Sequence, residues 1–129
     1  MRRLASLVLL ACGVVSCSAE VEPVPVCPET NAYPSFLITV RDSATGTVIT
    51  AGSTIIVTAR VGSVGDTVEV PNVAARNAYP TGIELGPGTF DVEIRRPGYQ
   101  EARRQDITVR GNSCGGAVTV TLDIALAKR

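Results

Sequence analysis

The chain of 129 residues contains no histidine and no tryptophan. Histidine is the commonest general base and a frequent metal ligand, so its absence excludes Ser-His-Asp and Cys-His catalysis. A metal site would have to be built from carboxylates, and no Asp-rich loop with the ligand spacing of a calcium site occurs. We therefore expect no metal, no cofactor and no enzymatic activity.

Aromatic residues are also scarce, at 4% of the chain against 45% apolar residues. The core must then be built from Val, Ile and Leu, a composition that suits strands better than helices. The formal net charge is zero, and loss of a basic leader would leave the protein slightly acidic, so no nucleic-acid partner is expected. The length indicates a single domain.

The apolar run of residues 4–15 is too short to span a bilayer as a stable helix. It follows Arg2 and Arg3, and a charged start before a short apolar run is the pattern of an export signal. The sequence Val14-Val15-Ser16-Cys17 resembles the lipobox of bacterial lipoproteins, in which the cysteine receives diacylglycerol and becomes the new amino terminus. We predict that residues 1–16 are a lipoprotein signal peptide and that Cys17 is the lipidation site.

Two other processing sites fit the leader sequence less well than Cys17. Cys12 ends a second tetrapeptide, but its Leu at the middle position fits the lipobox less well and the apolar run would be cut short. Ordinary signal cleavage after Ala19 would instead give a soluble periplasmic or secreted protein. Ser18 resembles the residue that permits sorting to the outer membrane. We predict a bacterial, membrane-anchored protein, placed in the outer membrane facing the periplasm or cell surface if the organism is Gram-negative.

The four cysteines can be assigned from this leader. Cys12 leaves with the signal peptide and Cys17 takes the lipid, so Cys27 and Cys114 remain. In an exported protein two remaining cysteines generally pair, and we predict a disulfide between them. Two unpaired thiols, or two metal ligands, are the alternative reading.

Residues 17–34 are rich in proline and glutamate. Prolines this dense are incompatible with a helix or a central strand. We predict that this segment is an extended, lipid-anchored tether that holds a domain of residues 35–129 off the membrane.

Alternating apolar residues in that domain predict short half-buried strands separated by Gly and Pro turns. No apolar run at helical spacing persists, so the fold class expected is all-β, a single β-sandwich of about seven strands. The long connection of residues 71–82 breaks the pattern and is the part most free to carry a function. Strands are expected at residues 36–42, 54–61, 67–70, 83–85, 90–95, 107–109 and 117–127, the last with Val118, Val120, Leu122, Ile124 and Leu126 inward.

Several short motifs follow one another between Leu37 and Leu126. They are Val40-Arg41-Asp42 before Thr45-Gly46, then Pro87-Gly88-Thr89-Phe90-Asp91-Val92, then Pro97-Gly98-Tyr99, and the alternation from Val118 to Leu126. Their order resembles the carboxypeptidase regulatory-like domain, also called peptidase-associated. This resemblance implies a prealbumin or transthyretin-like β-sandwich that acts as a structural or binding accessory module.

Arginines gather around residues 95–110 and could contact an anionic partner. The candidate contacts are Arg95, Arg96, Arg103 and Arg104, with Arg110 nearby. We favour the alternative that Glu93, Glu101 and Asp106 neutralise much of this patch. Tyr99 is expected to anchor the adjacent loop through a bond from its hydroxyl to backbone.

These observations together predict a non-catalytic cell-envelope lipoprotein whose β-sandwich is a binding or scaffold module. It contacts the membrane through its lipid, and its partner is expected to be an envelope protein or a glycan. A carbohydrate-binding domain is the alternative, which would need Tyr33, Tyr79 and Tyr99 on one face. A carboxylate-based hydrolase built on Asp91 and Glu93 is the least favoured.

Overall fold

The computed structural model describes residues 23, 27, 33–60 and 65–129. The predictions for the signal peptide, for Cys17 and for most of the tether concern residues outside these ranges.

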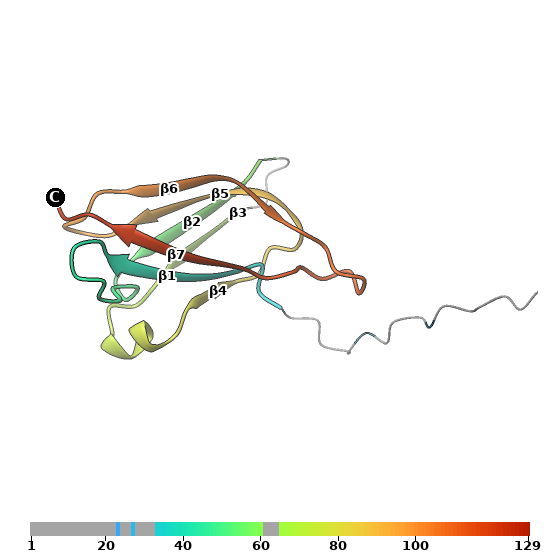
Figure 1. Cartoon of the computed structure of the whole chain (residues 1–129), viewed down its shortest axis with the longest axis horizontal. Helices are drawn as coiled ribbons and strands as arrows, with labels where there is room; N and C mark the ends of the chain where they lie inside the picture. Colours follow the sequence, from blue (N-terminus) through green and yellow to red (C-terminus); the bar gives the residue numbers. More distant parts are fainter. Residues whose placement is uncertain (1–22, 24–26, 28–32, 61–64) are drawn as a thin grey trace, which may run out of the picture.

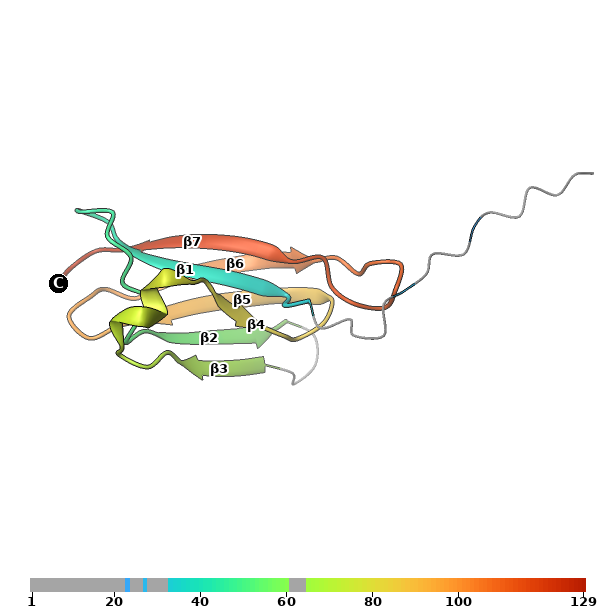
Figure 2. The same cartoon turned by 90° about the horizontal axis from the view of Figure 1, so that it is seen from below.

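The described chain forms two β-sheets that pack face to face (Figures 1 and 2). One sheet has the order β4-β1-β7 and the other the order β3-β2-β5-β6. A short 3₁₀ helix, η1, lies between β3 and β4, and no α-helix occurs among the described residues. The predicted all-β sandwich is confirmed. Its elements are β1 (Phe36–Asp42), β2 (Thr54–Ala59), β3 (Gly65–Glu69), η1 (Ala74–Ala78), β4 (Thr81–Ile83), β5 (Gly88–Arg95), β6 (Ala102–Val109) and β7 (Val120–Leu126).

The alternating residues of β1 and β5 form the centre of the core, because successive side chains of a strand point to opposite faces. The ring of Phe36 on β1 meets the ring of Phe90 on β5 edge to face, with 5.5 Å between their centroids. These strands belong to different sheets, so the ring pair joins the two layers. Apart from Tyr99, the remaining core is aliphatic, as the composition predicted.

The β5–β6 hairpin contains a register shift between Phe90 and Val92. Opposite this shift Asp106 has a positive φ of 57°, and its N–H donates to the carboxylate of Asp91 at 3.0 Å. The Asp91 carboxylate thus accepts a hydrogen bond from the N–H of Asp106, which the register shift leaves without a partner in the β-ladder.

The bounds of β1 agree with the prediction, and those of the other strands differ. β2 ends at Ala59, β3 spans Gly65–Glu69, β4 spans Thr81–Ile83 instead of residues 83–85, and β5 begins at Gly88.

β6 and β7 also differ. β6 begins at Ala102, so residues 102–106 belong to a strand rather than to a loop. The last strand begins at Val120, and the predicted inward residue Val118 is 51% exposed. Before this strand Asn112 accepts hydrogen bonds from the N–H groups of Cys114 and Gly116, and the turn brings Ala117 opposite Gly111. Ala117 is the buried residue there, so its neighbour Val118 points to the other face.

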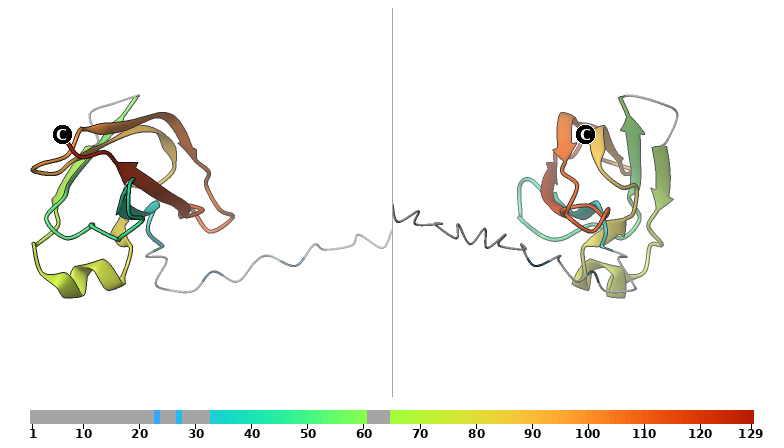
Figure 3. Two further views of the ribbon diagram at one scale, coloured as in Figure 1. Left: turned by 60° about the vertical axis from the view of Figure 1, so that its left-hand side comes forward. Right: turned by 90° about the vertical axis from the view of Figure 1, so that its right-hand side faces the viewer.

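The strand directions divide the sandwich into two poles. Because β7 runs parallel to β1 and β4 antiparallel to it, residues 84–88 and 110–119 lie at the pole where β1 begins. The near pole, as we call it, also holds the start of β1 (Figure 1). The connections 43–53, 70–80 and 96–101 gather at the opposite end, the far pole, together with the end of the chain (Figures 1 and 3).

The predicted disulfide between Cys27 and Cys114 is present, with 5.5 Å between the two Cα atoms. It joins the tether to the β6–β7 connection at the near pole. The bridge therefore ties residue 27 to the near pole.

Candidate functional site

The arginines predicted to contact an anion are placed in different environments. Arg95 and Arg103 both bind Glu93, at 2.6 and 3.0 Å, and Arg95 also lies 3.3 Å from Glu101. The hydrogen bond from Arg95, followed by that from Arg103, holds the pKa of Glu93 below its ordinary value against the opposing effect of burial. These two guanidinium groups are thus paired within the protein, by Glu93 and Glu101. Asp106, the third acidic residue expected to neutralise the patch, pairs with Arg60 at 2.9 Å instead.

Arg96 has a different role from its neighbours. Its Nε donates to the backbone carbonyls of Ile49 and Ala51 at 3.1 and 3.3 Å, and its guanidinium lies 5.1 Å from the centre of the Tyr99 ring. Arg96 therefore ties the β5–β6 turn to the β1–β2 connection. Arg104 donates to the carbonyl of Arg103, so the four arginines do not converge on one point.

The two outward carboxylates of β5, Asp91 and Glu93, do not show the opposite pKa shifts that a carboxylate-based hydrolase needs. Asp91 accepts the N–H of Asp106 and a bond from Arg60 at 3.1 Å, and these contacts lower its pKa, the Asp106 bond having the largest effect. The pKa of Glu93 is lowered as well. A carboxylate pair used for glycoside hydrolysis needs one member with a raised pKa, to serve as the acid. Both groups are ionised at neutral pH.

Tyr99 is 8% exposed, and its hydroxyl donates to the carboxylate of Asp42 at 2.9 Å. The expected bond to backbone is therefore wrong. The same carboxylate accepts the N–H groups of Ala44 and Thr45 at 2.8 and 3.2 Å, and Lys128 lies 3.6 Å away. The Tyr99 bond is the largest of the effects that lower the pKa of Asp42. This cluster closes the far pole by joining three segments distant in sequence.

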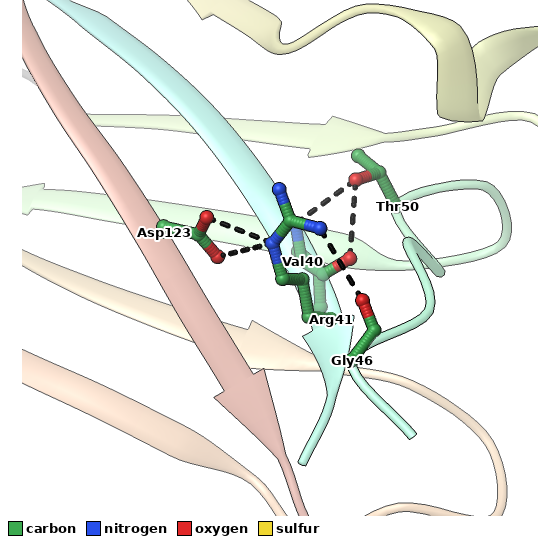
Figure 4. A network of polar contacts seen from close by, with 5 residues as sticks. All are labelled: Val40, Arg41, Gly46, Thr50 and Asp123. Carbon is green, nitrogen blue, oxygen red and sulfur yellow. Dashed lines mark hydrogen bonds and ion pairs between the residues drawn. The ribbon is translucent and has the colours of Figure 1, made fainter. Parts of the chain in front are cut away.

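A second polar network holds the β1–β2 connection beside this cluster (Figure 4). Arg41 on β1 binds Asp123 on β7 at 2.8 Å and donates to the carbonyl of Gly46 at 3.3 Å. The buried hydroxyl of Thr50 accepts the N–H of Val40 at 2.9 Å. The β1–β2 connection is thus fixed to the sandwich by hydrogen bonds of Arg41 and Thr50.

Replacing Tyr99 by Phe is expected to lower the melting temperature by a few degrees at neutral pH. Because the folded-state pKa of Asp42 is depressed, its stabilising effect is present above its unfolded pKa of about 4 and is lost as the pH falls through the folded value. The difference between the variant and the wild type should therefore shrink in acid. Thermal unfolding followed by circular dichroism over a pH series measures it.

Tyr79→Phe is the matched control, since Tyr79 is 75% exposed and its hydroxyl makes no hydrogen bond within the described residues. It should leave the melting temperature unchanged. Equal melting temperatures for Tyr99→Phe and the wild type at every pH would contradict the assigned role of the Asp42 contact.

A groove of about 290 Å³ lies between β3 and β4, beside the 71–82 connection. Its lining includes Glu69, Arg76 and Tyr79. Neither Glu69 nor Arg76 makes an ion pair within the part of the chain that the structure describes. The connection itself is anchored, because the side-chain oxygen of Asn77 accepts the N–H of Ala51 at 2.7 Å. The groove is therefore a firmly supported surface with unpaired charges of both signs.

Sequence reasoning singled out residues 71–82 but not this groove. The chain passes from one sheet to the other here, so β3 and β4 face each other only in the folded sandwich. A second hollow, of about 300 Å³, lies beside Arg96 and Tyr99. Both hollows are in the half of the domain that lies away from the tether.

The three tyrosines do not share one face. Tyr33 precedes Phe36, at the end of the β1–β4 pair where Phe36 pairs with Ile83. Tyr79 precedes Thr81, at the other end, where Thr81 pairs with Ile38. The two tyrosines therefore lie beyond opposite ends of this strand pair. Tyr99 is buried. An aromatic platform for a sugar is therefore not formed by these residues.

No group of three or more His, Cys, Asp or Glu residues is placed to hold a metal ion among the described residues. Within the same ranges no helix has the length and apolar character needed to cross a membrane. In comparisons with known proteins, no family model matches the chain and no curated protein matches it.

Proposed function

We propose that this protein is an exported, non-catalytic lipoprotein of the cell envelope, in which a lipid on Cys17 anchors a β-sandwich that binds or organises a partner. The observation that carries the proposal is the disulfide between Cys27 and Cys114. Disulfides form and persist in oxidising compartments outside the cytosol. The bridge thus supports the export that the leader sequence predicts.

The position of the bridge gives the anchor a defined reach. Ten residue steps separate Cys17 from Cys27. An extended Pro-rich segment spans about 3.1 Å per residue, so in that conformation the bridge would stand about 30 Å from the lipid. The near pole would face the membrane. The far pole and both hollows would point away from it, toward other envelope components.

We also propose that the domain is of the carboxypeptidase regulatory-like class, with the accessory role which that class implies. The seven-strand sandwich supports this. So do the positions of the motifs, since Pro87-Gly88 opens β5 and Pro97-Gly98-Tyr99 forms the β5–β6 turn, where Gly98 has a φ of 82°. Glycine adopts such a positive φ without strain.

The proposal is tested by affinity capture from native envelopes with tagged wild-type protein and two single variants. Tyr79→Ala alters the groove, whereas Tyr33→Ala removes an exposed tyrosine at the near pole. One envelope protein or glycan should be enriched with the wild type and with Tyr33→Ala, and lost with Tyr79→Ala. Recovery of the same material from all three, or of none, would contradict a binding role for the far half of the domain.

A further inference from the structure

The outer edge of β3 is unpaired among the described strands, because the sheet order ends at β3. The N–H of Val70 donates inward, to Ser53 at the start of β2. Successive N–H groups of a strand point to opposite sides, so those of Glu69 and Thr67 point away from β2. An unpaired edge of this kind can accept a further strand.

The groove lies beside that edge and is lined by residues of β3 and β4. Each of these two strands ends its own sheet, and Figure 2 shows them on the same side of the sandwich. Tyr79, 75% exposed, supplies an apolar surface there. Glu69 and Arg76 supply one charge of each sign, and neither is paired within the described residues. Glu69 belongs both to the outer edge of β3 and to the lining of the groove. The unpaired edge therefore adjoins a groove that offers an apolar contact and one charge of each sign.

We propose that this groove binds an extended peptide segment of another envelope protein, which adds to the outer edge of β3 as a strand. Its bound peptide carries an acidic side chain beside Arg76, a basic one beside Glu69 and an apolar one against Tyr79. This inference rests on the proposed function as a binding module and names the partner class. The backbone edge and the two opposite charges favour a peptide, whereas a sugar would require the aromatic platform that the tyrosines do not form.

The test uses the purified mature protein, with its disulfide intact, to select binders from a displayed library of random decapeptides. The strongest peptide is then titrated against the wild type and two variants. Thr67→Pro removes an outward N–H without removing a bond to β2, because proline is tolerated on an edge strand. It should weaken binding about tenfold or more. The matched control Thr67→Ala keeps the N–H and should stay within about twofold of the wild type.

Exchanging the charges of Arg76 and of the peptide residue beside it gives a second test. This test does not require Thr67→Pro to fold normally. Arg76→Glu should weaken the selected peptide, and changing the acidic residue of the peptide to lysine should restore binding to that variant. Hydrogen exchange should show the amides of Thr67 and Glu69 becoming protected when the peptide is added to the wild type.

Three results would overturn the inference. These are selection of no peptide that binds the wild type, equal affinity of the selected peptide for Thr67→Pro and Thr67→Ala, and self-association of the protein that Thr67→Pro abolishes. The last result would assign the β3 edge to a second copy of this chain. These measurements use purified protein, so their outcome does not depend on export or lipidation. Peptide binding can be disproved while the protein is shown to be lipidated, and it can be demonstrated while lipidation is disproved.

Discussion

Replacing Cys27 and Cys114 together by serine is expected to lower the free energy of unfolding by about 4 kcal/mol. The two cysteines are 87 residues apart, so their bridge closes a loop that includes almost all of the sandwich. In the chain-entropy description a bridge stabilises by restricting the unfolded chain, and the effect grows with loop length. Cys27 lies outside the sandwich strands, so the substitutions leave the apolar core in place.

Urea unfolding with and without a reductant measures this effect and provides its own control. The wild type should lose stability when the reductant is added, and the double serine variant should show the lower stability under both conditions. Superimposable unfolding curves for the wild type with and without reductant would contradict the expected contribution of the bridge.

Replacing Cys17 by serine is expected to move the protein almost completely from the membrane fraction to the soluble fraction or to leave it as an unprocessed precursor. The reason is that the proposed diacylglycerol is the attachment of the mature protein to the bilayer, and each buried methylene of a lipid chain contributes about 0.8 kcal/mol. Fractionation followed by immunoblotting measures the distribution.

Cys12→Ser is the matched control, because Cys12 ends the competing tetrapeptide inside the predicted signal peptide. This variant should remain in the membrane fraction. Release of Cys12→Ser together with retention of Cys17→Ser would reverse the assignment of the lipidation site.

Strands with a regular alternation of apolar residues were predictable from the sequence. β1 alternates at every position, and its predicted bounds, Phe36 to Asp42, agree with the structure. The inward residues of β5, which are Phe90, Val92 and Ile94, are also confirmed. In these strands the period of two is unbroken because one face packs against the opposite sheet.

Where the pattern depends on contacts distant in sequence, prediction was less successful. The first half of β6 is polar on both faces, so only its pairing with β5 identifies it as a strand. Val118 fits the apolar alternation of the last strand, but Ala117 is buried in its place. The Tyr99–Asp42 contact joins residues 57 positions apart, and local patterns contain no signal for such a bond.

The groove was beyond sequence reasoning for the same reason. Its walls come from two strands in different sheets, and the unpaired edge beside it follows from the position of β3 at the end of the sheet order. A sequence pattern predicts which residues of a strand are buried. It does not predict which strand ends the sheet.

Intact mass spectrometry of the mature protein extracted from membranes tests the proposed anchored envelope module most directly. The account predicts a chain that begins at Cys17, carries a diacylglyceryl group on that residue and retains the Cys27–Cys114 disulfide. A chain that begins at Glu20, has no lipid and is recovered from the soluble fraction would contradict it.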